Sequence, residues 1–186
     1  MKSLVVVCLF AVVSFFGSIT QAQETPKIDV FAGYSYVRER PSTGTANDFS
    51  LNGGSASFAY NINNWLSGVA DFGAYHNGNI LGTGVDGTLS TYLFGPRVSY
   101  RHLGRFTPFG EVLFGGAHTS AHLAGAGASD NAFAMIVGGG VDYRLNRHLA
   151  IRPIKVDYLL TRFSETGNGG QNQNNLRAST GVVFRF

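Results

Sequence analysis

Side chains of two opposite kinds alternate along most of this chain, and the alternation restricts the folds that it can adopt. One segment reads TYLFGPRVSYR, residues 91–101. Its Tyr92 and Phe94 fall on one side of the alternation, and its Arg97 falls on the other. A period of two residues is that of a β-strand, whose successive side chains point to opposite faces. The pattern therefore predicts long amphipathic strands rather than helices.

Eight segments show this period, and their ends are placed to within about 2–4 residues: 28–37, 50–60, 65–76, 88–101, 106–118, 131–144, 149–162 and 176–186. Three connections between them are short, at 61–64, 102–105 and 145–148. Four are long and rich in Gly, Asn, Ser and Thr, at 38–49, 77–87, 119–130 and 163–175. Because short and long connections alternate without an intervening helical period, we expect successive strands to pair antiparallel as an up-and-down meander.

The charged residues decide which face of the closed sheet points inward. A water-soluble barrel such as a lipocalin has an apolar interior, whereas a membrane barrel has an apolar exterior. The small or polar faces of the segments carry Asp71, Arg97, Glu111, Asp142, Lys155, Asp157, Arg177 and Arg185. The opposite faces carry Tyr34, Phe58, Phe72, Phe94, Phe114, Val137, Tyr158 and Phe184. Side chains already fill the interior of an eight-stranded barrel, so the bulky faces belong outside, against lipid. The predicted fold is all-β, an eight-stranded antiparallel up-and-down transmembrane β-barrel, with each strand long enough to cross a bilayer.

Two prolines and one arginine depart from this pattern. Pro96 and Pro153 lie inside predicted strands, where each forfeits a ladder hydrogen bond. A β-bulge at each proline would relieve that loss. Counting from Lys155, Arg152 has the lipid-facing phase. A bulge at Pro153 would account for this phase, and extension of Arg152 to the lipid headgroups is the alternative.

The first 22 residues have the layout of a secretory signal peptide. Lys2 precedes an apolar run from Leu4 to Phe16, and small and polar residues follow up to Ala22. The run is shorter than the roughly 20 residues that a spanning helix needs. We therefore expect cleavage near Ala22 and a barrel domain at 23–186. Removal of the signal takes away Cys8, the only cysteine, so the exported chain forms no disulfide.

Three stretches resemble a known family: NNLRASTGVVFRF at the C-terminus, IRPIKVDYLLTRF and PFGEVLFGGAH. The chain is similar over 27–186 to the small outer-membrane β-barrel domain proteins, which include the OmpA-type and OmpX-type barrels. The resemblance implies that the barrel-assembly machinery reads the aromatic C-terminus, here Val182, Phe184 and Phe186. It also implies location in the outer membrane, contact with outer-membrane lipids, periplasmic termini and short turns, and extracellular long loops.

Opposite charges inside so narrow a barrel can pair, which predicts a plugged lumen with a structural role. The four long loops would then present a surface for envelope integrity, adhesion or binding of an extracellular ligand. The alternative is a small ion or solute channel lined by the same charges, although aqueous channels normally have many more strands. The small excess of cations indicates no nucleic-acid partner.

One stretch, AHTSAH, leaves an enzyme as a further alternative. His118 and Ser120 lie two residues apart and share a face, within reach of each other. The pair resembles the His-x-Ser arrangement of outer-membrane lipid A deacylases, in which an acid orients the histidine. Asp130 is the only acid nearby, and it is expected in a loop. Without a metal-ligand spacing or a phosphate-binding loop elsewhere, the sequence predicts no metal, no cofactor and no catalytic residues.

Overall fold

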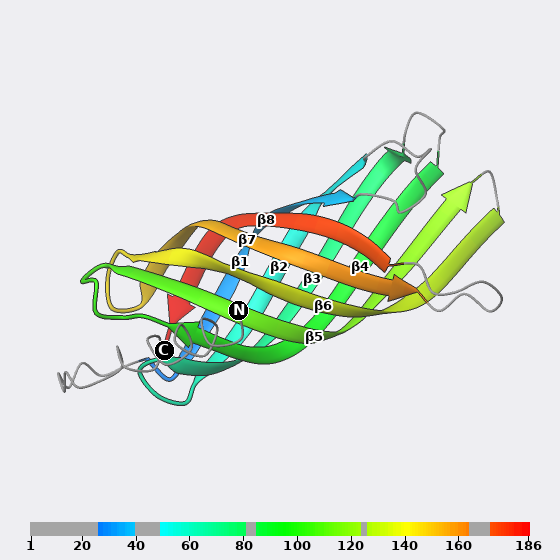
Figure 1. Ribbon diagram of the computed structural model, residues 1–186. Coiled ribbons are helices and arrows are strands. Elements are labelled where there is room, and N and C mark those ends of the chain that lie inside the picture. The colour runs from blue at the N-terminus through cyan, green and yellow to red at the C-terminus, as the bar shows by residue number, and fades with distance from the viewer. Residues whose placement is uncertain (1–25, 40–48, 81–84, 124–125, 164–171) are drawn as a thin grey trace, which may run out of the picture.

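The computed structural model describes residues 26–39, 49–80, 85–123, 126–163 and 172–186. Eight strands pair antiparallel with their neighbours and close on themselves, which confirms the predicted eight-stranded barrel (Figure 1). The strands are β1 (Ile28–Glu39), β2 (Phe49–Asn61), β3 (Leu66–Ile80), β4 (Val85–Ser99), β5 (Phe106–Leu123), β6 (Ala126–Arg144), β7 (Leu149–Phe163) and β8 (Asn172–Arg185). Within these ranges, none of the secondary structure is a helix long and apolar enough to span a membrane. The predicted signal peptide lies outside the described residues.

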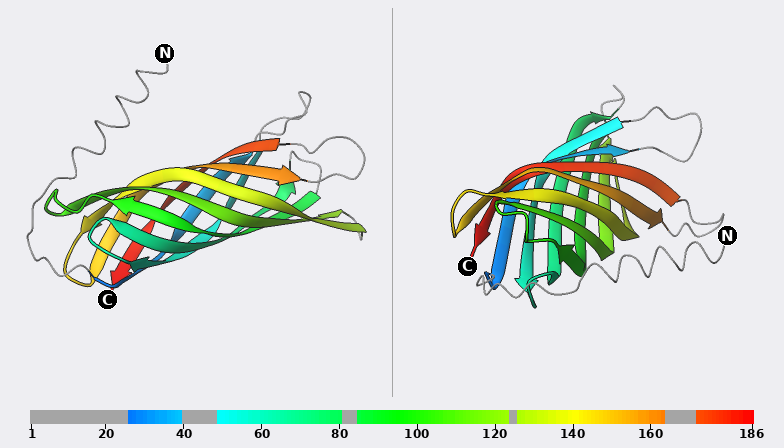
Figure 2. Two further views of the ribbon diagram at one scale, coloured as in Figure 1. Left: turned by 60° about the horizontal axis from the view of Figure 1, so that its bottom comes forward. Right: turned by 60° about the vertical axis from the view of Figure 1, so that its left-hand side comes forward.

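The barrel closes where the first strand meets the last. β1 and β8 run side by side in Figure 2, with Gly33 paired to Gly181 and Ser35 paired to Ser179. The Ser35 hydroxyl lies 2.7 Å from the Ser179 hydroxyl and 2.6 Å from that of Ser55 on β2. This inward serine therefore joins three strands across the closure.

The two faces of the sheet differ as the alternation predicts. Phe94 has an exposed fraction of 52%, whereas Leu93 beside it is fully buried. All eight bulky residues assigned to the outer face are exposed: Tyr34, Phe58, Phe72, Phe94, Phe114, Val137, Tyr158 and Phe184. An exterior of aromatic and aliphatic side chains is that of a barrel surrounded by lipid.

Two of the predicted long loops are largely strand. β3 and β4 continue to Ile80 and from Val85, so they occupy most of 77–87. β5 and β6 leave only 124–125 between them, in place of the loop expected at 119–130. Figure 1 shows the β5–β6 hairpin extending well beyond the end of β7. Outside a membrane a strand does not need an apolar face. These extensions therefore lack the alternation of apolar and polar residues by which the other strands are recognised.

A bulge accompanies one proline but not the other. The register of β7 shifts by one residue between Arg152 and Lys155, around Pro153. At Pro96 the expectation of a bulge is wrong, because the register against β5 is the same before and after it. The β4–β5 ladder lacks the pairs at Gly95 and Pro96 and then resumes, so the missing N–H is accommodated without an inserted residue.

Candidate functional site in the barrel interior

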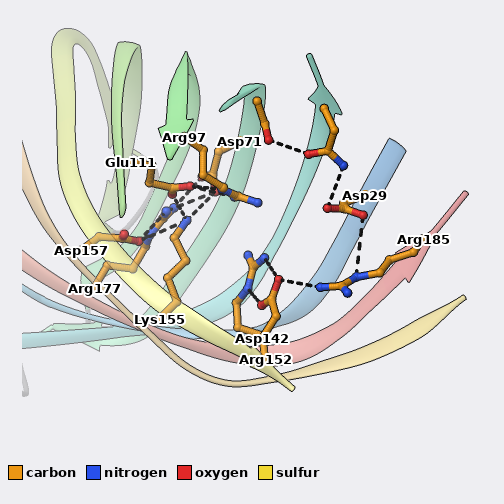
Figure 3. Close-up of polar contacts among 12 residues, drawn as sticks. Asp29, Asp71, Arg97, Glu111, Asp142, Arg152, Lys155, Asp157, Arg177 and Arg185 are labelled. Carbon is orange, nitrogen blue, oxygen red and sulfur yellow. Dashed lines mark hydrogen bonds and ion pairs between the residues drawn. The ribbon is translucent and has the colours of Figure 1, made fainter. Parts of the chain in front are cut away.

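Six charged side chains from five strands meet in the middle of the barrel. We call them the central network: Asp71 on β3, Arg97 on β4, Glu111 on β5, Lys155 and Asp157 on β7, and Arg177 on β8. All six are at least 97% buried. Each belongs to the inward phase of its strand, so the alternation brings the charges to one place (Figure 3). Three carboxylates there balance three cations.

Each cation of the central network contacts at least one carboxylate at close range. Arg177 Nη1 lies 2.7 Å from Asp71 Oδ1, and Arg177 Nε donates to Asp157 Oδ2 at 2.7 Å. Lys155 Nζ lies 2.5 Å from Glu111 Oε1 and 3.1 Å from Asp71 Oδ2. Arg97 Nε donates to Glu111 Oε2 at 2.7 Å. Pairing of this kind offsets the cost of burying the charges, and the network links β3, β4, β5, β7 and β8 across the lumen.

A second group of charges lies nearer the short turns. This turn-side network consists of Asp29, Arg101, Asp142, Arg152 and Arg185. Arg152 binds Asp142 through two nitrogens, at 2.7 Å and 3.1 Å. Arg185 lies between Asp142, at 3.6 Å, and Asp29, at 3.8 Å. Arg101 lies 3.3 Å from Asp29, and burial lowers the pKa of its guanidinium while the Asp29 carboxylate opposes that shift.

The position of Arg152 corrects the sequence-based alternative that it extends to the headgroups. Its side chain is fully buried inside the barrel, because the bulge at Pro153 turns it inward together with Lys155. The Arg152 guanidinium lies between two rings, 4.5 Å from the centroid of Phe31 and 4.4 Å from that of Phe109. Arg97 also lies over the Phe109 ring, at 4.5 Å. These cation–π contacts connect the turn-side network to the central network.

An apolar layer fills the barrel on the loop side of the central network. Its buried members are Val37, Leu51, Leu89, Leu93, Leu113, Ala117, Ala132, Ala134, Ile136 and Leu159. Leu113 follows Glu111 on β5, and Leu159 follows Asp157 on β7, each one inward position closer to the loops. Leu113 is paired to Ile136, and Ile136 to Leu159, so they cross three adjacent strands at one level. Tyr75 joins the two layers, since its hydroxyl accepts a hydrogen bond from Arg177 at 3.0 Å.

The structure places all eight charged residues selected from the sequence inside the barrel, and it divides them between the two networks. Asp71, Arg97, Glu111, Lys155, Asp157 and Arg177 meet in the centre, whereas Asp142 and Arg185 lie toward the turns. Sequence reasoning left out Asp29 and Arg101, and it left Arg152 between two alternatives, a bulge at Pro153 and extension to the headgroups. Asp29 and Arg101 have the inward phase of β1 and of the segment after β4, which is the signal that would have selected them. Arg152 points inward although the count from Lys155 assigns it to the outer face, because the bulge shifts the alternation by one residue.

Where their side chains are described, the residues of the remaining hypotheses lie on the outer surface. His118 Nδ1 lies 2.9 Å from the Asn131 side-chain oxygen, which belongs to a neutral amide. Ser120 lies one outward position further along β5. The Asp130 side chain lies outside the described part of the structure. In the last strand, Phe184 and Phe186 are exposed and Val182 is partly exposed on the same outward face.

Comparison with known proteins agrees with this architecture. No curated protein sequence matches the chain. Neisserial surface protein A has a similar fold, with a TM-score of 0.68, 18% identity, and coverage of 86% of this chain and 97% of that one. Ail of Yersinia pestis has a TM-score of 0.60 and 15% identity, over 87% of this chain and 99% of that one. The N-terminal barrel of OprF from Pseudomonas aeruginosa has a TM-score of 0.53 and 16% identity, over 88% and 100%.

A family model described as the outer membrane protein beta-barrel domain matches residues 8–186. This match covers every strand of the barrel. The chain therefore belongs to the family of outer membrane protein beta-barrel domains, and its location is the outer membrane.

Proposed function

We propose that the protein is a non-enzymatic barrel with a sealed lumen that presents its extracellular end for adhesion, envelope integrity or another surface interaction. The observation that carries the proposal is the filled interior. The central network and the apolar layer lie in series along the barrel axis, both almost completely buried. A solute would have to displace compensated charges and then cross a largely apolar layer, whose few polar side chains, Thr91, Thr161 and Asn175, are themselves buried. Both steps are costly. Since the lumen is filled, binding would take place on the outer surface of the molecule.

The extracellular end is asymmetric, which favours a role in surface interaction. β5 and β6 pair with each other as far as Leu123 and Ala126, whereas β7 pairs with β6 only as far as Phe163 opposite Ala132. β4 accompanies β5 to Asp86 opposite His122. In family members of this orientation the long loops are extracellular. The β3–β6 side of the barrel therefore forms a wall that projects beyond the β7–β8 side (Figure 1).

Among the structural relatives, Ail is named as an attachment invasion locus protein, and one of its structures is a complex with the heparin analogue sucrose octasulfate. These relatives support a role in attachment, which we propose here for the projecting wall. An acid that orients His118 is the feature that a hydrolase would require, and the contact of His118 with the Asn131 amide does not favour one.

Shortening the β5–β6 hairpin tests this role. His118 is paired to Asn131, so replacing 119–130 by Asn-Gly joins two facing residues through a two-residue turn of the kind that suits a hairpin. We expect the shortened barrel to fold as the parent does, because both charge networks and the apolar residues up to Ala117 remain. Adhesion of cells that express it to host cells or surface polymers should fall to the level of cells lacking the protein.

The matched control keeps the length of the hairpin and replaces His118 and Ser120 by alanine. These substitutions remove the hydrolase candidates but preserve the wall, so adhesion should remain at the parental level. Equal adhesion by the shortened and parental proteins, at equal surface abundance, would exclude the wall as the binding surface.

A further inference from the structure

At the short-turn end of the barrel, the described residues expose basic side chains and no acidic side chain. The acidic residues whose side chains the structure describes are all buried in the lumen: Asp29, Asp71, Glu111, Asp142 and Asp157. The described charged side chains accessible at the periplasmic end are Lys27, Arg105, Arg144 and Arg147. That rim therefore carries positive charge that no exposed acid among these residues offsets.

Three of these cations lie on two neighbouring turns that are hydrogen-bonded to each other. The Arg144 backbone N–H donates to the Arg105 carbonyl at 2.8 Å. The Arg144 guanidinium donates to the Gly104 carbonyl at 2.9 Å. The turn that follows β6 also carries Arg147, which is exposed. We call Arg105, Arg144 and Arg147 the cationic rim. The hydrogen bonds between the turns hold the two backbones together and position the Arg144 side chain.

Aromatic rings place the cationic rim at the depth of lipid headgroups. Phe106 and Tyr143 pack outside the barrel next to it, with ring centroids 5.0 Å apart. Tyr100, directly after β4, and Trp65, in the turn between β2 and β3, are also exposed. The Trp65 carbonyl accepts a hydrogen bond from the Ser99 N–H at 2.7 Å. Exposed aromatic rings of membrane barrels gather at the interface between the hydrocarbon and the headgroups.

The same turns expose aliphatic side chains between the cations. Leu103 has an exposed fraction of 53% and Leu145 one of 46%. Water alone would solvate the guanidinium groups but not the leucines. An anionic phospholipid meets both requirements, because its phosphate accepts hydrogen bonds from guanidinium groups and its glycerol and acyl regions lie beside the leucines.

We propose that the cationic rim binds the headgroup of an anionic glycerophospholipid in the periplasmic leaflet, in preference to a zwitterionic one. The net negative charge of the headgroup supplies counter-charge that no described acidic side chain of this end provides. The proposal concerns the short-turn end and goes beyond the surface role of the extracellular end.

Trp65 is the only tryptophan in the chain and lies beside the β4–β5 turn, so its fluorescence reports on the lipids at this rim. The protein is refolded into phosphatidylcholine vesicles that contain either dibrominated phosphatidylglycerol or dibrominated phosphatidylcholine. Quenching of Trp65 then gives the lipid exchange constant, which is the affinity for phosphatidylglycerol relative to that for phosphatidylcholine. We expect the affinity for phosphatidylglycerol to be about fivefold higher than that for phosphatidylcholine. This factor corresponds to the free energy that one cation contributes to lipid binding at a membrane surface. High salt should reduce this preference.

The variant R105Q/R147Q removes two charges and leaves the Arg144 hydrogen bonds in place, so it should fold and its exchange constant should approach unity. R105K/R147K retains the charge and should retain most of the preference. Arg38→Gln at the opposite end should leave the preference unchanged. Equal quenching by the two lipids in the parent, an unchanged preference in R105Q/R147Q, an equal loss in Arg38→Gln, or displacement by inorganic phosphate at constant ionic strength would each overturn the proposal.

Discussion

Replacing Asp71 by asparagine is expected to lower the free energy of unfolding by about 3 kcal/mol, the lower end of the range for breaking a buried ion pair. Asp71 is fully buried and contacts both Arg177, at 2.7 Å, and Lys155, at 3.1 Å. Arg177 keeps Asp157 and Lys155 keeps Glu111, which limits the loss. The network nevertheless acquires one unbalanced positive charge in a fully buried site. Urea unfolding in detergent or bilayers, followed by the emission of Trp65, measures the change.

A double variant separates charge balance from local packing. Asp71→Asn combined with Lys155→Met leaves two carboxylates and two arginines in the central network, so most of the lost stability should return. If the double variant is as unstable as the sum of its two single variants, the sites act independently, and the network does not couple the strands.

Replacing Gly33 by alanine is expected to destabilise the closure of the barrel by about 2–3 kcal/mol, as overpacking of a filled interior does. A Cβ atom at Gly33 would collide with the Thr180 carbonyl oxygen, and it would lie 2.7 Å from the Phe31 ring and 2.8 Å from the Gly181 backbone. Relief of the backbone contacts requires β1 to move away from β8, and relief of the ring contact requires Phe31 to shift from the guanidinium of Arg152 on which it stacks. Cooperative unfolding at lower urea concentration is the expected result.

Gly68→Ala is the matched control, since a Cβ atom at that position of β3 would meet nothing within 4 Å. We expect its stability to remain within about 0.5 kcal/mol of the parent, as for other exposed positions. A similar loss at Gly33 and Gly68 would mean that the cost comes from the change in backbone freedom and not from the closure of the seam.

The barrel itself follows from the sequence because a lipid environment imposes a rule on every strand. Phe94 and Phe184 must face outward, and so Arg97 and Arg185 on the other phase must face inward. This constraint applies only to the parts of the strands that lie within the membrane. The sequence 119–130 consists mostly of small and polar residues with no apolar alternation, which is why it has the appearance of a loop although β5 and β6 extend into it.

Two parts of the interior, the position of Arg152 and the apolar layer, could not be predicted from the sequence, for different reasons. A bulge exchanges the two faces of a strand, so the inward position of Arg152 cannot be found by counting from Lys155. The apolar layer leaves a weak signal: Leu93, Leu113 and Ile136 interrupt the alternation in YLF, VLF and MIV. Each interruption is minor within its own strand, and only the register shows that they lie beside one another inside the barrel.

Single-channel recording in a planar bilayer tests the central claim, that the two layers seal the lumen, most directly. The protein is shown to be folded by its heat-dependent electrophoretic mobility before it is inserted. We predict no discrete conductance, because ions would have to cross both the compensated charges and the apolar layer around Leu113. Reproducible openings from the folded protein would contradict a sealed lumen and would support the channel in its place.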